Sequence, residues 1–399
     1  MTDPAPPADI LAGIRTWVGT ADAVDGFIAG LAELVAIRSG TGDADGVSRV
    51  ADRLAVALRD LGAAVTLRTD GPGGPTLVAH VQGAAPGPRI ALIGHLDTVA
   101  APGAPEPILD LHDGRAWGPG SVDMKGGLLI VIHALRAIRH ATGGVLPRGE
   151  LVVIFGPDEE IGSPVGGIAM RALVPGCDAA LVLEPGRPSG AVVVARKGMM
   201  QARVHVRGRA AHAGVEPEKG RSALLAAAHA TITLHAITGL GGPAGGVTVN
   251  VGTLHGGTRP NVVAAEAVLE LDLRASTTVA FDAAVAAIRA VVGAPAVPDV
   301  TMTLELGNRF PPMERLPSTD ALLARVMRVG AALGLEVGAV ATGGASDANV
   351  IATLGVPVLD GLGPIGGGMH GPDEHVDLAT LPDRVALLAG TILELTGPG

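Results

Sequence analysis

Two kinds of hydrophobic pattern divide the chain. In its first part, short apolar runs typical of buried parallel strands alternate with segments in which apolar residues recur at helical spacing. The predicted strands cover about 64–69, 75–81, 88–94, 151–155 and 179–183. The predicted helices cover about 47–61, which Gly62 ends, and about 124–141. This alternation predicts an α/β domain with a mixed, mostly parallel sheet and helices on both faces.

Near Lys197 the pattern changes, and apolar and polar residues begin to alternate with a period of two. The predicted order is strand, helix, strand, strand, helix, strand, at about 197–207, 219–236, 246–254, 263–274, 278–291 and 300–306. This order is that of a ferredoxin-like α+β domain, and the alternation indicates a sheet with one open face. The α/β pattern returns after about residue 317. We therefore expect a domain at 196–309, inserted into a domain made of 1–195 and 310–399.

Charge and cysteine content exclude several classes of protein. The 399 residues carry a net charge of -10 and include one cysteine, Cys177. No basic run is present to neutralise phosphates, so nucleic acid is not an expected partner. A single cysteine excludes an intrachain disulfide framework and a cysteine-based zinc site. The N-terminus has no signal-peptide pattern, and no apolar run reaches the roughly 18–20 residues that span a bilayer. We expect a cytoplasmic protein without a membrane partner.

The segment Gly94–Val99 carries the first candidate chemistry, because it follows the predicted strand at 88–94. His95 and Asp97 lie at or just past the C-terminal end of that strand, where open α/β sheets bind their ligands. Two residues apart on an extended chain, their side chains point to the same side. An imidazole and a carboxylate in one cleft suit a metal ligand and a group that orients it, although such a pair also occurs as a structural hydrogen bond.

Further acidic and histidine side chains lie in turns or follow other apolar strands. They are Asp123, Glu159, Glu160, Glu184 and His370. Carboxylates that end apolar strands would repel one another in a dry cleft unless cations neutralise them. Two histidines with three carboxylates form a ligand set that fits Zn²⁺, with Co²⁺ or Mn²⁺ as substitutes. The pattern therefore indicates a site for two divalent cations.

Six blocks of the sequence resemble the di-zinc metallopeptidase and deacylase family of glutamate carboxypeptidase, aminoacylase, acetylornithine deacetylase and succinyl-diaminopimelate desuccinylase. The blocks are Gly94–Val99, Gly118–Gly127, Asp158–Ser163, Leu183–Gly186, Gly208–Gly214 and Met369–Asp377. They occur in the family's order over nearly the whole chain. The segments Ser39–Gly46, Gly343–Ala348 and Asn308-Arg309 are most similar to bacterial glutamate carboxypeptidases.

The resemblance implies two zinc ions per chain and a role for each residue at the predicted site. The implied ligands are His95 and Glu184 for one ion, Glu160 and His370 for the other, and Asp123 between both. Because adjacent Glu159 and Glu160 cannot both point at one metal from an extended chain, one of them remains for proton transfer. The resemblance makes Glu159 the general base on the water at the metals, and it makes Asp97 the group that holds the His95 imidazole.

The family usually has a second acid directly after the bridging aspartate, and this chain has Met124 there. We expect the metals to be unaffected, because Lys125-Gly126-Gly127 follows as in the family. The resemblance also implies a cis peptide bond between Asp123 and Met124.

The remaining implied roles belong to the inserted domain, which serves the family as a lid and a dimerisation domain. His212 would stabilise the tetrahedral oxyanion, with Asn261 and Arg274 as substrate contacts. Arg309, expected to follow the last inserted strand at the mouth of the cleft, would bind the substrate's free carboxylate. The other possibility for Arg309 is a hinge arginine paired with a surface acid. A homodimer is expected, with His212 acting in its own or its partner's subunit.

Three functions remain open from the sequence. The first is a zinc-dependent exopeptidase that removes a C-terminal, glutamate-like amino acid from a peptide or N-acyl conjugate by means of metal-activated water. The second keeps the chemistry but acts as an N-acyl-amino-acid deacylase. The third is an inactive binding or scaffold protein on the same fold, which the intact ligand set and Glu159 argue against. The expected substrate is a small molecule or short peptide with a free carboxylate.

Overall fold

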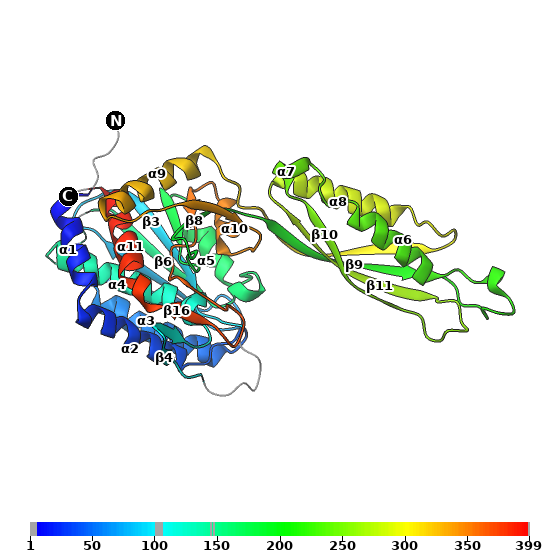
Figure 1. The fold of residues 1–399 in the computed structure, drawn as a ribbon, viewed down its shortest axis with the longest axis horizontal. Coiled ribbons are helices and arrows are strands. Elements are labelled where there is room, and N and C mark those ends of the chain that lie inside the picture. Colours follow the sequence, from blue (N-terminus) through cyan, green and yellow to red (C-terminus); the bar gives the residue numbers. More distant parts are fainter. Residues whose placement is uncertain (1–5, 100–106, 144–145, 147, 398–399) are drawn as a thin grey trace. The chain divides into compact units, whose positions relative to one another are not determined.

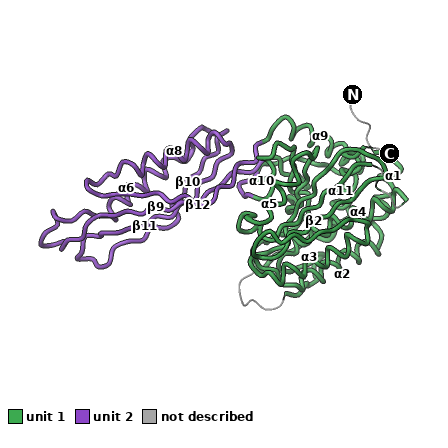
Figure 2. Tube along the Cα trace, turned by 180° about the vertical axis from the view of Figure 1, so that it is seen from behind, with its two compact units in different colours: residues 1–194, 315–341, 346–399 green, residues 195–314, 342–345 purple. Residues whose placement is uncertain are grey.

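The computed structural model describes residues 6–99, 107–143, 146 and 148–397. The chain forms two compact units (Figures 1 and 2). Unit 1 comprises 1–194, 315–341 and 346–399, and unit 2 comprises 195–314 and 342–345.

Unit 1 is built on a mixed six-stranded sheet of order β1-β2-β6-β3-β7-β14. Its strands are β1 Ala64–Arg68, β2 Thr76–Gln82, β6 Glu150–Gly156, β3 Arg89–His95, β7 Ala179–Val182 and β14 Val358–Leu359. The pairs β6–β3, β3–β7 and β7–β14 are parallel, and β1–β2 and β2–β6 are antiparallel. The predicted mixed, mostly parallel α/β sheet is thus confirmed, and its parallel part is the part that carries the site.

Helices bury both faces of this sheet (Figure 1). The helices of unit 1 are α1 Ala8–Val18, α2 Ala21–Val35, α3 Ala44–Asp60, α4 Gly126–Ala141, α5 Gly166–Leu173, α9 Pro317–Ala332, α10 Asp347–Ala352 and α11 Leu381–Thr396. On β6, Val153 packs in the core cluster shared with α4 and α11, and its neighbour Val152, which points to the other face, is also fully buried. Strands buried on both faces explain the continuous apolar runs in the sequence.

Two small sheets remain, and the first of them lies within unit 1. One has the order β15-β16-β5-β4, with β15 Gly366–Gly367, β16 His375–Asp377, β5 Arg115–Trp117 and β4 Asp110–His112. The other pairs β13 Ala339–Thr342 with β8 Val192–Arg196. The first of these matters for function, because its connections lead to Asp123 and His370.

Unit 2 has an antiparallel four-stranded sheet of order β10-β11-β9-β12. Its elements are β9 Gly198–Arg207, α6 Ala223–His235, α7 Gly242–Gly245, β10 Thr248–Gly256, β11 Glu266–Ala275, α8 Thr278–Gly293 and β12 Thr301–Phe310. Helices α6 and α8 pack on one face over a core that includes Val204, Leu269 and Phe281. The other face carries polar side chains such as Gln201, Arg203 and Glu270, which explains the period-two alternation.

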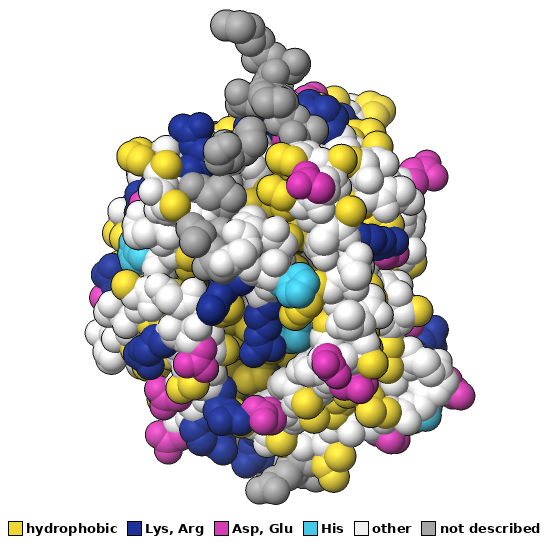
Figure 3. All heavy atoms as spheres, turned by 90° about the vertical axis from the view of Figure 1, so that its left-hand side faces the viewer, with side chains coloured by type: hydrophobic (Ala, Val, Ile, Leu, Met, Phe, Trp, Pro, Cys, Tyr) yellow, Lys and Arg dark blue, Asp and Glu magenta, His cyan; other side chains and the backbone are white. Residues whose placement is uncertain are grey.

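Two further observations concern the surface. No helix among the described residues is long and apolar enough to cross a membrane. On the face of the molecule shown in Figure 3, basic and acidic side chains are interspersed with hydrophobic ones, so neither sign of charge dominates that face.

Candidate metal centre

Three neighbouring parallel strands deliver the first candidate residues to one edge of the unit 1 sheet. His95 is the last residue of β3 and pairs with Gly156 at the end of β6. Glu159 and Glu160 form a short 3-10 turn just after β6, and Glu184 follows β7. Because β6, β3 and β7 are parallel neighbours, their C-terminal ends meet, and this brings the side chains together.

Asp123 comes from a different element, an irregular turn at Ser121–Lys125 that precedes α4. The peptide bond between Asp123 and Met124 is cis, as the resemblance implied. The predicted helix at 124–141 therefore begins later than expected, at Gly126. Gly127 explains how the turn comes close to the sheet: a side chain there would collide with the carbonyl of Leu183, directly before Glu184.

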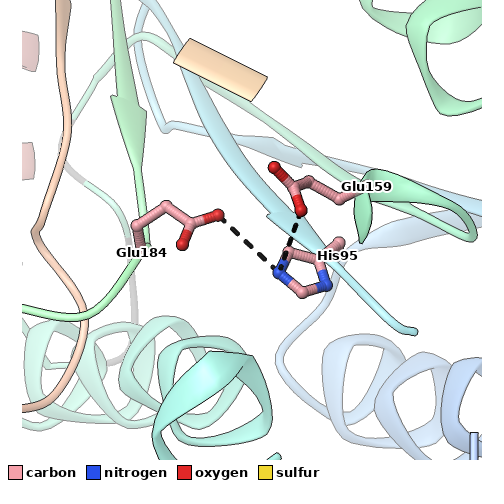
Figure 4. Close-up of side chains that lie close together, drawn as sticks. All are labelled: His95, Glu159 and Glu184. Carbon is pink, nitrogen blue, oxygen red and sulfur yellow. Dashed lines mark ion pairs between the residues drawn. The ribbon is translucent and has the colours of Figure 1, made fainter. Parts of the chain in front are cut away.

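One histidine faces three carboxylates. His95 Nε2 lies 3.2 Å from Asp123 Oδ1 and 3.7 Å from Glu184 Oε1. Glu159 Oε2 lies farther away, at 4.0 Å from the same nitrogen. Figure 4 shows the carboxylates of Glu159 and Glu184 both directed toward the His95 ring. The His95 side chain is only 1% exposed, so these charges meet with little water between them.

A second histidine faces the other side of the same aspartate. His370 Nε2 lies 3.4 Å from Asp123 Oδ2 and 3.3 Å from Glu160 Oε2. The two carboxylate oxygens of Asp123 therefore point at two different histidines. His370 differs from the other residues of the cluster in that its side chain is 51% exposed.

The donor set fits divalent cations. Ligand atoms of His95, Glu159 and Glu184 lie within 4.8 Å of one another, and so do those of His95, Asp123 and Glu160. In addition, Glu160 Oε1 is buried and has no hydrogen-bond partner among the described residues. An unpartnered buried carboxylate oxygen is costly unless something positive binds it, and imidazole with carboxylate is a ligand set for zinc. By position alone, Glu159 could be a ligand or a base.

Asp97 connects the parts of this cluster. The Nδ1 of His95 lies 3.0 Å from the Asp97 carbonyl oxygen and 3.3 Å from Asp97 Oδ1. The same carboxylate accepts hydrogen bonds from the backbone N–H of Glu159 at 3.1 Å and of Glu160 at 3.3 Å. The Thr41 hydroxyl also donates a hydrogen bond to Asp97 Oδ2, at 2.8 Å. Asp97 thus fixes both the His95 ring and the turn that presents the two glutamates.

Burial and charge shift the pKa values of the cluster. Burial, helped by the charge of Glu184, raises the pKa of Glu159 well above its usual value. Burial raises the pKa of Glu160 to about 7. Burial would also raise the pKa of Asp123, but hydrogen bonds from His370 and His95 hold it well below its usual value. In His95, hydrogen bonds to Asp123 and Asp97 outweigh burial and raise the pKa. Asp123 is therefore the carboxylate that most strongly favours its charged form, whereas Glu159 and Glu160 both hold a proton more readily than an ordinary carboxylate.

The structure adds residues that the sequence analysis did not single out. Asp347 is fully buried at the start of α10 and accepts a hydrogen bond from Ser163, which follows the Glu159–Ile161 turn. Burial raises the pKa of Asp347 to about 7. Glu374 is also buried and binds the backbone around Asp123. Thr41, Ser163, Asp347 and Glu374 all lie in segments that carry the family resemblance, so membership in those segments was the available signal.

In unit 2, His212 and Asn261 lie side by side on exposed loops. His212 forms a backbone bridge with Val262, and the N–H of Ala213 donates to the carbonyl of Asn261 at 3.0 Å. The Nδ1 of His212 accepts from the N–H of Gly214 at 3.2 Å. Nε2 is thus the His212 nitrogen that can face a substrate.

The two candidate arginines lie at the other end of the unit 2 sheet, opposite Met199 and Met200 of β9. Arg274 bonds Asp272 and the carbonyl of Gly343. Arg309 was expected to follow the last strand, but β12 continues to Phe310 across an irregularity after Leu306. Arg309 therefore lies within β12 and not after it.

The Arg309 guanidinium contacts helix α8. It bonds Asp282 at 2.7 Å and lies 4.4 Å from the centre of the Phe281 ring. This contact is the one expected of an arginine paired with a surface acid, and a substrate carboxylate would have to replace Asp282.

Comparisons with known proteins agree on one family. A sequence profile of "Peptidase family M20/M25/M40" matches residues 91–394. Carboxypeptidase G2 of Pseudomonas sp. (strain RS-16) is 30% identical over 376 residues, which is 92% of this chain and 88% of that protein. Succinyl-diaminopimelate desuccinylase of Variovorax paradoxus (strain S110) is 29% identical over 76% of this chain and 81% of that protein.

The fold is found in solved structures as well. The crystal structure of aminopeptidase PepT from Bacillus cereus aligns with a TM-score of 0.80 and 25% identity, over 93% of this chain and 98% of that one.

Proposed function

The chain belongs to peptidase family M20/M25/M40 and is a metal-dependent amidohydrolase, and from this premise we propose that it is a di-zinc exopeptidase that removes a C-terminal, glutamate-like amino acid from a peptide or N-acyl conjugate. The similarity to a protein named carboxypeptidase G2 supports this substrate class. We assign catalysis to 1–195 and 310–399, and the lid and dimerisation role to 196–309.

One observation carries the proposal: the two oxygens of Asp123 face two different histidines, His95 at 3.2 Å and His370 at 3.4 Å. A carboxylate in this position can bridge two cations. Glu184 then completes the site of His95, and Glu160 completes the site of His370. Bound zinc ions would act as Lewis acids and lower the pKa of water.

Glu159 is the group we assign to proton transfer. Its neighbour Glu160 lies closer to a histidine, at 3.3 Å against 4.0 Å for Glu159. Because burial raises its pKa, Glu159 holds a proton more readily than an ordinary carboxylate. It can therefore accept a proton from the attacking water and deliver it to the leaving amine. Asp97, through the backbone N–H of Glu159, keeps this carboxyl group in place.

We infer a homodimer from the separation of the candidate residues within unit 2. His212 and Asn261 lie beyond the Glu266 end of β11, and Arg274 lies at the other end. Eight residues of extended strand separate the ends by roughly 26 Å. One amino-acid-sized substrate cannot contact both groups in a single unit 2. We propose that a substrate held by Arg274 and Arg309 meets His212 and Asn261 of a second copy.

The surface of α6 supports this dimer. Leu225 and Ile232 are seven residues apart and therefore lie on one face of the helix, and they are 52% and 71% exposed. Beside α6 lies β10, one of the two edge strands of the sheet. An apolar helix face next to an unpaired edge suits a two-fold contact between identical surfaces.

The deacylase remains the second candidate, because a relative named succinyl-diaminopimelate desuccinylase is 29% identical. A hydrolysis screen with added Zn²⁺ or Co²⁺ separates the two. One series keeps a C-terminal glutamate and varies the acyl group, and the other keeps one acyl group and varies the amino acid. We expect activity to depend on the amino acid and to tolerate changes of the acyl group. Dependence on the acyl group alone would favour the deacylase.

A further inference from the structure

Glu374 is a buried carboxylate that accepts hydrogen bonds from backbone N–H groups in and beside the turn that carries Asp123. It is 5% exposed. Its Oε2 accepts from the N–H of Gly120 at 2.8 Å, and its Oε1 accepts from Val122 at 3.1 Å and Asp123 at 3.0 Å. The Glu374 carbonyl also accepts from the N–H of Gly118 at 2.9 Å. One residue thus satisfies four N–H groups of a turn that has no regular ladder of its own.

The same residue ends the loop that carries His370. Glu374 lies directly before β16, which pairs with β5, the strand that leads into the Asp123 turn. Within the loop, the N–H of Gly371 bonds the carbonyl of Gly368 at 2.9 Å. Gly368 has a φ of 71°, and a side chain there would collide with the Asp373 carbonyl. The loop is therefore closed tightly, and its end is fixed at Glu374.

His370 depends on this loop more than the other candidate ligands depend on theirs. Its own φ is 63°, and its side chain is 51% exposed, whereas His95 is 1% exposed. Little neighbouring structure covers the His370 ring, so the backbone of its loop must determine where the ring lies.

We propose that Glu374 is a positioning residue that joins the His370 loop to the Asp123 turn, so that both side chains reach the same metal ion. The inference rests on the metal assignment proposed above. A carboxylate is needed here because each of its two oxygens accepts, whereas the amide of glutamine has one oxygen and turns an N–H group toward backbone N–H groups.

The test is a zinc titration of the metal-free, full-length protein against a competing chelator. Glu374→Gln removes one acceptor, and Glu374→Asp keeps the charge but shortens its reach. The matched acid-to-amide control is Asp377→Asn. Asp377 is the last residue of β16 and forms an ion pair with Arg115. We expect wild type and control to bind two ions. In both Glu374 variants we expect one ion to bind at least about tenfold more weakly, the scale for losing a group that orients ligands, while the other changes little.

Cobalt loading gives a second readout, because the visible spectrum reports the loss of a histidine ligand from one site. Unchanged affinity for both ions would overturn the inference, and so would equal weakening of both, since Glu374 would then act on Asp123 alone. Variants that are unfolded without metal would also overturn it, by assigning Glu374 to the fold. A wild-type protein that binds no zinc would instead contradict the proposed function itself.

Discussion

The candidate metal centre of unit 1 and the candidate substrate contacts of unit 2 are organised in different ways. In unit 1, His95 ends one parallel strand and Glu159 and Glu184 follow two others, and the two carboxylates lie 3.7–4.0 Å from His95 Nε2. In unit 2, His212 is exposed on a loop, and Arg309 already has a partner in Asp282. Side chains at strand ends are placed by the sheet itself, whereas His212 and the two candidate arginines lie at opposite ends of the unit 2 sheet, which does not bring them together.

The largest effect should come from Glu159. We expect Glu159→Gln to lower kcat by about 10²–10⁴-fold, because the variant cannot accept a proton from water, while its metal content stays near that of wild type. Glu160→Gln should lose metal instead, since that oxygen faces His370. Elemental analysis alongside kinetics checks both. If the two variants lose metal and activity alike, the division into base and ligand is wrong.

Mixing two inactive variants tests whether the two regions meet between subunits. His212→Ala and Glu159→Gln should each be inactive as homodimers. If His212 acts in the partner, a mixed dimer regains one complete site of two. A statistical mixture, in which half of the dimers are mixed, should then recover about a quarter of wild-type activity. Refolding equal amounts together and assaying the product measures this. No recovery in a mixture shown to contain mixed dimers would place His212 in its own subunit.

The Arg309 pair gives the next effect. If Arg309 binds the substrate carboxylate, Arg309→Ala should cost about 2–4 kcal/mol in kcat/KM and remove the preference for a free acid over its methyl ester. Asp282→Asn should then lower KM, because the guanidinium no longer has to leave its partner.

Arg203→Ala, on the open face of the same sheet and paired with Glu270, is the control. A purely structural pair gives a different result: Asp282→Asn and Arg309→Ala would both lower the melting temperature, and neither would change the preference for the free acid.

The smallest effect concerns the stability of the metal-free protein. Asp347 has a pKa of about 7 when folded, above its usual value of 3.8, so the folded state keeps a proton that the unfolded chain releases. Stability should therefore fall as pH rises through this window, by about 2–3 kcal/mol between pH 5 and pH 8. Urea unfolding at both pH values measures it. Asp347→Asn should flatten the slope, and an equal slope in the variant and the wild type would contradict the assignment.

Much of unit 1 follows from sequence pattern. The apolar runs around 88–94 and 151–155 correspond to β3 and β6. A strand buried on both faces requires apolar side chains at nearly every position, so such strands are visible in the sequence. The sequence could not place the start of α4, because the irregular turn at Asp123 replaces the first helical turn. Local pattern did not single out Glu374 or Asp347 within the segments that carry the family resemblance, because the groups that they bind, the Asp123 turn and Ser163, lie far away in the chain.

Arg309 shows the opposite limit. The alternation of apolar and polar residues that predicts this strand ends at Leu306. The strand itself continues to Phe310, because β12 has an irregularity between Leu306 and Arg309 that interrupts the alternation. The contact with Asp282 on α8 joins residues 27 positions apart, which no local pattern encodes.

The central claim is that Asp123 joins two metal sites, and metal content measured together with activity tests it most directly. Exhaustive chelation of the purified protein, followed by stepwise return of Zn²⁺, should show activity rising until about two ions are bound per chain, as expected of a two-metal site. Elemental analysis at each step supplies the count. Full activity in protein shown to contain no metal, or complete recovery with far less than one ion per chain, would contradict the account.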